Sequence, residues 1–150
     1  MNVRQSASDH RVDVGLLVLR AAGLFLALTF GWQKASGYYL LIRSGANLST
    51  SGLAPLIRMM SLPAPALLAV CAVLNESLGA LCIAFGFLTR AAAAVGAIGM
   101  AVALYISLRL GEEPLRAALY LVIFLGLAIT GPGKYSIDRI FLARAKGSHE

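Results

Sequence analysis

The segment PALLAVCAVLNESLGALCIAFGFL, residues 65–88, is an apolar run with a carboxylate near its centre. A membrane-spanning helix needs about 20 mostly apolar residues, so this run is long enough to cross a bilayer. Glu76 lies between Asn75 and Ser77, far from both ends of the run. Ionisable side chains at such depth are costly, face protein or water, and mark functional sites. The segment therefore predicts a membrane protein and makes Glu76 a candidate functional residue.

The remaining sequence has the same character. Of its 150 residues, 59% are hydrophobic and 13% are charged, whereas soluble domains have about a quarter charged. Three more stretches approach spanning length: Val14–Gly31, Ala91–Leu108 and Leu115–Gly131. The first has no small-residue cleavage site, which favours a retained helix over a signal peptide. We predict an all-α integral membrane four-helix bundle over residues 14–131, a polar tail at 1–13 and a basic tail at 132–150.

The connections are predicted from turn residues and aromatic side chains. Trp32, Tyr38 and Tyr39 follow the first span and are expected to mark its exit into the headgroup layer. A long connection over residues 36–63 contains a loop rich in Gly, Ser and Asn at 44–52. Leu53–Met60 is predicted to form a short interfacial helix. Only Thr89 and Arg90 separate the second and third spans, which predicts a tight hairpin.

The net charge of +6 points to a membrane rather than to nucleic acid, because the basic residues gather at the ends of apolar segments. With four spans, both termini lie on one side. That side carries seven Lys or Arg residues and the other carries five, which favours cytoplasmic termini by the positive-inside rule.

A helical wheel divides the second span into two faces. Small residues surround Glu76, namely Ala69, Ala72, Gly79 and Ala80, and large ones lie opposite, namely Leu67, Leu74, Leu78, Leu81 and Phe85. Glu76 should therefore point into the bundle. In the first span Arg20, Ala27, Gly31 and Lys34 form one stripe, and Arg20 is the expected charged partner of Glu76, across a vertical gap of about 9 Å that a long side chain or water would bridge.

The candidates for ligand binding or proton handling are Glu76, Arg20, Asn75, Gln33 and Lys34. Structural alternatives stand beside these roles. Glu76 could be a protonated carboxyl that bonds to nearby backbone, and Arg20 a snorkelling side chain at a helix end. Asn75 and Ser77 could be interhelical hydrogen-bonding groups. The small residues of the third span, above all Ala93, Gly96 and Ala97, offer a surface for a homodimer.

Several chemistries are disfavoured. Cys71 and Cys82 are eleven residues apart, about 16 Å along one helix, so they cannot form a disulfide within the chain. His10 and His149 lie at the chain ends, and no span offers a histidine ligand for haem. Neither a metal-ligand cluster nor a nucleophile motif is visible. Whether the protein is itself an enzyme stays open.

A set of short motifs, in order along the chain, resembles the DoxX family of small bacterial four-helix membrane proteins. The motifs are Arg20 followed by GWQK at 31–34, LPAP at 62–65, NESLGA at 75–80, GFLTR at 86–90 and GPGKYSID at 131–138. The resemblance implies a helical bundle in the bacterial cytoplasmic (inner) membrane. It also points to redox physiology, because the family name comes from a subunit of a quinone-linked thiosulfate oxidoreductase.

Two functions remain open at this level. In the first, the bundle is an accessory subunit of a membrane redox complex and binds a quinone or another lipid beside Glu76, which supplies protons while a partner protein supplies electrons. In the second, the protein is a non-enzymatic scaffold or an assembly or chaperone protein. A small-solute transporter is a third option and would require a dimer to enclose its pathway.

Overall fold

A computed structural model describes residues 3–139, and in this range the chain is built from helices and turns without strands. The elements are α1 (Val3–Leu26), η1 (Ala27–Gly31), α2 (Trp32–Arg43), α3 (Ala54–Met59), α4 (Pro65–Leu74), η2 (Asn75–Gly79), α5 (Ala80–Phe85), α6 (Thr89–Leu110) and α7 (Leu115–Thr130), where η1 and η2 are π-helical turns. The predicted all-α class is confirmed.

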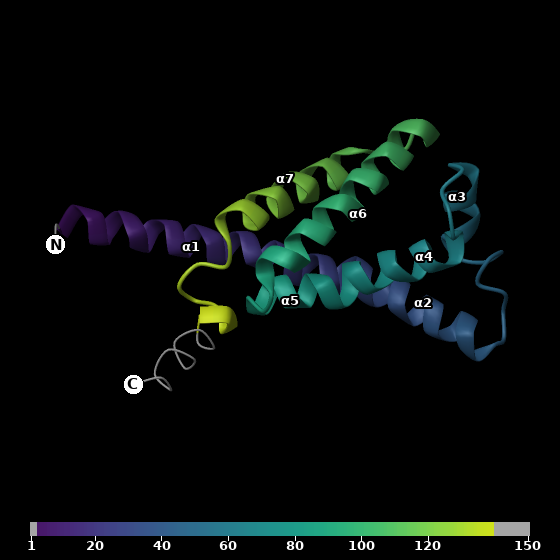
Figure 1. Cartoon of the computed structure of the whole chain (residues 1–150), viewed down its shortest axis with the longest axis horizontal. Coiled ribbons are helices and arrows are strands. Elements are labelled where there is room, and N and C mark those ends of the chain that lie inside the picture. The colour runs from purple at the N-terminus through teal and green to yellow at the C-terminus, as the bar shows by residue number, and fades with distance from the viewer. Residues whose placement is uncertain (1–2, 140–150) are drawn as a thin grey trace.

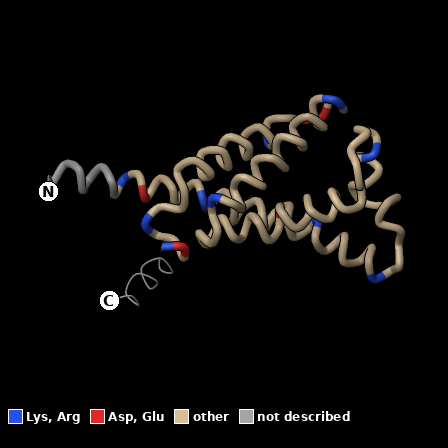
Figure 2. The backbone as a smooth tube through the Cα atoms, in the orientation of Figure 1, with Lys and Arg blue, Asp and Glu red and all other residues tan. Residues whose placement is uncertain are grey.

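These elements form four rods (Figure 1). The first is α1, η1 and α2 in continuous helix, and the second is α4, η2 and α5. Three helices, at His10–Arg43, Pro65–Phe85 and Thr89–Leu110, are long and apolar enough to cross a membrane, while α7 is apolar but has only 16 residues. Charged residues gather toward the ends of the rods (Figure 2).

The rods form a fork rather than a closed cylinder. The hairpin of α6 and α7 lies close to α1 and α5 near the end of the molecule that carries both termini, then diverges from α2 and α4 toward the other end (Figure 1). The short helix α3 lies at the open end. Residues buried near the closed end include Ile83, Phe124 and Leu127, each at most 1% exposed.

The first rod is longer than predicted. The helix does not end at Gly31 but continues through Arg43, so Trp32, Tyr38 and Tyr39 lie within it rather than after its end. Gly31 keeps helical dihedrals, with φ −61° and ψ −47°, and no proline interrupts the segment. At the other end the polar residues predicted as a tail are helical from Val3 onward.

The other boundaries agree with the sequence within a few residues. The loop at 44–52 and the short helix after it are present, and Pro65 begins the second rod. The tight turn is Gly86–Leu88 rather than Thr89-Arg90, because Gly86 takes a left-handed conformation at φ 73° and ends α5. Glycine is the usual residue for such a helix end.

The small residues of α6 pack inside the chain. A β-carbon on Gly96 would lie 2.7 Å from a ring carbon of Phe124 in α7, and Ala93 and Ala97 are 0% and 4% exposed. Close helix packing is the ordinary use of small residues in membranes. The proposed homodimer surface at Ala93, Gly96 and Ala97 is therefore wrong, because α7 already covers it.

Residues 131–139, here called the C-terminal clasp, fold back onto the closed end of the bundle. The backbone N–H of Asp138 donates to the carbonyl of Gly86, and Lys134 forms an ion pair with Asp13 at 3.2 Å. Ser136 is 4% exposed. The part of the predicted basic tail at 132–139 is thus docked on the helices, whereas its continuation at 140–150 lies outside the described residues.

Asp138 caps the start of α6. Its carboxylate accepts hydrogen bonds from the backbone N–H groups of Leu88, at 2.7 Å, and of Thr89, at 3.1 Å. A carboxylate at a helix N-terminus satisfies free N–H groups and interacts favourably with the helix dipole.

We expect Asp138→Ala to lower the free energy of unfolding by about 1 kcal/mol, the usual cost of losing a capping side chain. The measurement is the apparent Tm of the purified protein in detergent. Glu112→Ala is the control, since Glu112 is an exposed carboxylate in the α6–α7 turn. Equal Tm values for the two variants would show that the Asp138 cap contributes nothing to the stability of the bundle.

Candidate functional site

Two π-helical turns pack against each other in the middle of the molecule. They are η1 in the first rod and η2 in the second. Their contact centres on Gly31, where a β-carbon would lie 2.3 Å from the carbonyl oxygen of Glu76 and 2.9 Å from the Cα of Ser77. Single π turns in α-helices are rare and frequently occur at functional sites. The candidate site is thus built where two irregular turns meet.

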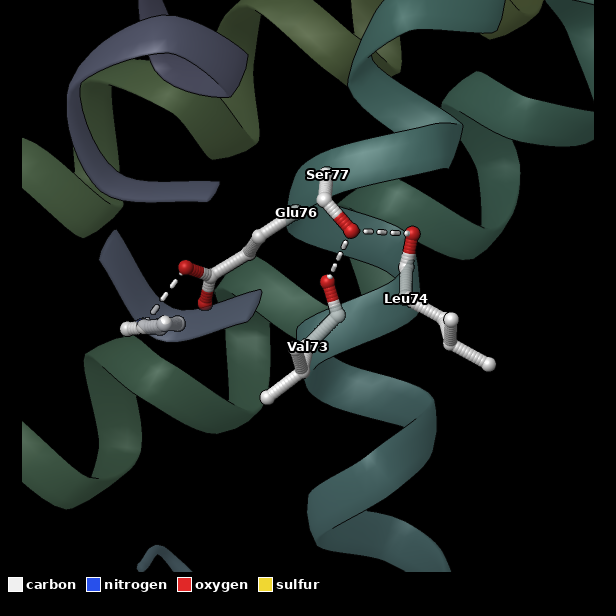
Figure 3. A network of polar contacts seen from close by, with 5 residues as sticks. Val73, Leu74, Glu76 and Ser77 are labelled. Carbon is white, nitrogen blue, oxygen red and sulfur yellow. Dashed lines mark hydrogen bonds and ion pairs between the residues drawn. The ribbon is translucent and has the colours of Figure 1, made fainter. Parts of the chain in front are cut away.

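Each π turn carries a hydroxyl that bonds back to its own helix. Thr29 donates to the carbonyl of Phe25 at 2.6 Å, and Ser77 donates to the carbonyl of Val73 at 2.7 Å. Serine and threonine side chains often bond back to the carbonyl one turn earlier in a helix, and such bonds accompany local bending. Figure 3 shows the Ser77 hydroxyl directed along its own helix while the Glu76 side chain reaches away from it toward the neighbouring helix. Ser77 therefore supports the turn, and Glu76 is free for other contacts.

Glu76 forms an ion pair with Lys34. The Lys34 ammonium donates to Glu76 Oε2 at 2.5 Å, and the two side chains are 37% and 11% exposed. Glu76 therefore points into the bundle, as the wheel predicts. Burial makes an isolated charge expensive, so each partner lowers the cost of the other. Lys34 keeps two further N–H donors for water or a ligand.

Arg20 is not the partner of Glu76, and this prediction is wrong. Its guanidinium donates to four backbone carbonyls, those of Ile83 at 3.1 Å, Ala84 at 2.9 Å, Pro132 at 3.3 Å and Tyr135 at 2.5 Å. Gly31 marks the level of Glu76 in the first rod, and Arg20 lies eleven residues before it, about 16 Å along the helix axis. Arg20 instead joins the end of α5 to the C-terminal clasp.

The other two candidates are separated from the ion pair. The Asn75 amide lies against α6, because a β-carbon on Gly99 would be 2.9 Å from its Nδ2. That position agrees with the alternative role of Asn75, an interhelical hydrogen-bonding group. Gln33 is exposed on the outside of the first rod. Of the five candidates, the structure brings only Lys34 and Glu76 together.

A cavity of about 80 Å³ adjoins the ion pair between the arms of the fork. Lys34 and Glu76 both line it, and its wall includes four polar residues that sequence reasoning missed: Ser107, Glu113, Arg116 and Tyr120. The Arg116 guanidinium lies 4.4 Å from the centre of the Phe30 ring, a cation–π contact. The signal for these residues was weak, since Glu113 resembles an ordinary turn residue before Pro114 and Arg116 an ordinary basic residue near the start of the last span.

Tyr120 is the most enclosed of the new residues. It is 6% exposed and lines the cavity together with Lys34 and Glu76. A buried tyrosine hydroxyl normally finds a hydrogen-bond partner. The Tyr120 hydroxyl is therefore a candidate donor to whatever occupies the cavity.

A second cavity, of about 370 Å³, lies nearer the open end between α3 and α6. Its wall is mostly apolar, with Leu56, Met59, Met60 and Ile106, and it includes Arg109. The Arg109 side chain donates to the Tyr105 hydroxyl at 3.1 Å and lies over the same ring. Both cavities use α6 as a wall, so the fork encloses a polar site and an apolar one along the same helix.

Comparison with known proteins places the chain in a family. Residues 15–109 match the DoxX family model. Over 134 residues the chain is 37% identical to the inner membrane protein YqjF of Escherichia coli (strain K12), an alignment that covers 85% of this chain and 92% of YqjF. No solved structure matches. The matched region contains both π turns and the Lys34–Glu76 ion pair, and the chain belongs to the DoxX family.

Proposed function

We propose that this protein is an accessory subunit of a membrane redox system and that it binds a quinone or a similar lipid-soluble molecule beside Lys34 and Glu76. The observation that carries the proposal is the ion pair on the wall of a cavity inside an otherwise apolar bundle. Charged groups at this depth are costly unless they serve a ligand, a proton path or each other. Here one of the two partners keeps unused hydrogen-bond donors.

The cavity offers the groups that a quinone requires. A quinone carbonyl accepts hydrogen bonds, which the remaining Lys34 donors and the Tyr120 hydroxyl can supply. Reduction adds two electrons and two protons, and the Glu76 and Lys34 pair can pass protons to the reduced oxygen. The electrons come from a redox partner.

The dimensions set the binding mode. A cavity of about 150 Å³ holds one benzene ring, so the cavity of about 80 Å³ admits the reactive edge of a ring rather than a whole quinone. The larger apolar cavity beside α6 can take part of the isoprenoid tail.

The location follows from the family and the charge pattern. YqjF is an inner membrane protein, and we place this chain likewise in the bacterial cytoplasmic membrane. The positive-inside rule favours cytoplasmic termini, by seven Lys or Arg residues against five. The open end of the fork then faces the periplasm. The scaffold alternative, in which partners recognise the small-residue helix faces and the basic tail, loses one of these surfaces, since α7 covers Ala93, Gly96 and Ala97.

Glu76→Gln and Lys34→Met are expected to lower the amount of quinone that co-purifies with the protein by about tenfold each, which is the effect of losing one hydrogen bond to a charged group. The measurement is quinone per protein by mass spectrometry, followed by rebinding of added ubiquinone. Glu112→Gln is the matched control because it makes the same change at an exposed carboxylate.

The double variant Glu76→Gln/Lys34→Met separates stability from binding. It removes both charges together, so it should regain the apparent Tm lost in either single variant yet still fail to bind quinone. If the wild-type protein neither retains nor rebinds quinone, or if Glu76→Gln binds as well as wild type, the quinone proposal is wrong.

A further inference from the structure

The two ends of the fork differ in polarity, so the surroundings of the Lys34–Glu76 pair are polar toward one end and apolar toward the other. Toward the open end, polar residues line the cavity up to its mouth, where Glu113 and Arg116 are exposed. Glu113 lies in the α6–α7 turn, and Tyr120 is seven residues further along the chain, about 10 Å deeper. The polar wall thus extends from the surface to the middle of the bundle.

Toward the termini the interior is packed and apolar. Phe124 lies one turn beyond Tyr120, their ring centres are 5.9 Å apart, and Phe124 is 1% exposed. Ile83, Ala97 and Leu127 fill the same layer, each at most 4% exposed. Native interiors of this kind have few voids large enough for water. We call this set, Ile83, Ala97, Phe124 and Leu127, the apolar floor.

The Arg20 contacts lie between the apolar floor and the end that carries the termini. The guanidinium is directed at the carbonyls of the α5 end and the C-terminal clasp, and Arg20 is 3% exposed. Four of its five N–H donors bond to backbone carbonyls, all of them in α5 or the clasp, so it offers no continuation of a polar path toward Glu76. The floor and the Arg20 contacts together separate the ion pair from the end that carries the termini.

From this asymmetry we propose that the fork is a one-sided, water-filled access path that connects Lys34 and Glu76 only with the compartment opposite the termini. The charged and titratable groups along it are Glu113 at the turn, Arg116 and Tyr120 on α7, and Lys34 on α2. A proton taken up by the Glu76 carboxylate comes from water in this path and returns to it. This sidedness does not depend on whether a quinone binds.

The test is cysteine accessibility on α6. In a protein carrying Cys71→Ala and Cys82→Ala, the variant Ala103→Cys places a thiol on the cavity wall, and Ala97→Cys makes the same substitution in the apolar floor. The reagent is a membrane-impermeant methanethiosulfonate with a sulfonate group. It is applied to intact spheroplasts and to inverted vesicles, after protease removal of a C-terminal tag has identified the side that carries the termini.

Ala103→Cys should react only from the side opposite the termini, and at least about tenfold faster than Ala97→Cys from either side, since buried apolar cysteines are inert. Ser107→Cys, which lies nearer the α6–α7 turn, should also react only from the side opposite the termini. It replaces Ala103→Cys in the experiment if that variant does not fold. Labelling from the side of the termini, equal labelling from both sides, or no labelling beyond that of Ala97→Cys would overturn the proposal. The two proposals can fail separately. The protein can show this labelling pattern without binding quinone, and it can bind quinone without showing this labelling pattern.

Discussion

Replacing Arg20 with lysine is expected to lower the free energy of unfolding by about 3 kcal/mol, because hydrogen bonds to a charged group are worth about 1.5–3 kcal/mol each and lysine cannot retain all four. The four acceptors lie on the end of α5 and on the C-terminal clasp, so they require the planar fork of a guanidinium. For a chain of this size the loss corresponds to roughly 6–12 °C in apparent Tm. The measurement is thermal unfolding in detergent.

Arg90→Lys is the control for the Arg20 variant. Arg90 is exposed and makes one long hydrogen bond, 3.4 Å, to the carbonyl of Ile129. Its replacement should change the apparent Tm by no more than a degree or two, in keeping with the small effects of most surface substitutions. If Arg20→Lys were equally mild, Arg20 would be a snorkelling side chain rather than the link between α5 and the clasp.

The sequence predicts the fold well where hydrophobic length decides the structure. Pro65 and Gly86 bracket the second rod, and the last helix ends where Gly131 follows Thr130. Proline and glycine act through local backbone geometry, so their effect can be read without knowledge of the partners. The inward direction of Glu76 is also predictable, because small and large residues separate on the wheel.

The end of the first rod shows where local reasoning stops. Trp32 and Lys34 resemble an interfacial boundary, yet Trp32 is 71% exposed in the middle of a continuous helix. Lys34 is tolerated there because Glu76 meets it from another rod. The relevant fact is a contact between residues 42 positions apart, and a hydropathy window contains no information about it.

The same limitation applies to the partner of Glu76. Depths counted from Val14 and Leu88 brought Arg20 within reach, but the first rod begins at Val3 and the second ends at Phe85, so these two residues did not mark a common level. The two π turns add a second error, since each inserts about one residue and rotates the helix that follows by about 100° relative to an α-helical wheel. Tyr120 and Arg116 were missed because only the divergence of the α6–α7 hairpin exposes them to the cavity.

Gly31→Ala is expected to destabilise the protein by about 1–3 kcal/mol and to weaken the Lys34–Glu76 contact, because overpacking a tight interface costs this much. The added β-carbon would meet the Glu76 carbonyl oxygen at 2.3 Å and backbone atoms at 2.9 Å. Backbone cannot rotate away as a side chain can, so η1 and η2 must separate by about 1 Å to restore ordinary contact. The measurements are apparent Tm in detergent and quinone per protein.

Gly37→Ala makes the same change six residues later in the same helix, where a β-carbon would meet nothing within 4 Å. Alanine is the better helix former, so this variant should be neutral or up to about 1 kcal/mol more stable. The two substitutions therefore carry opposite expected signs with identical chemistry. If Gly31→Ala behaved like Gly37→Ala, the π turns would not be in contact, and the position of Glu76 beside Lys34 would need another explanation.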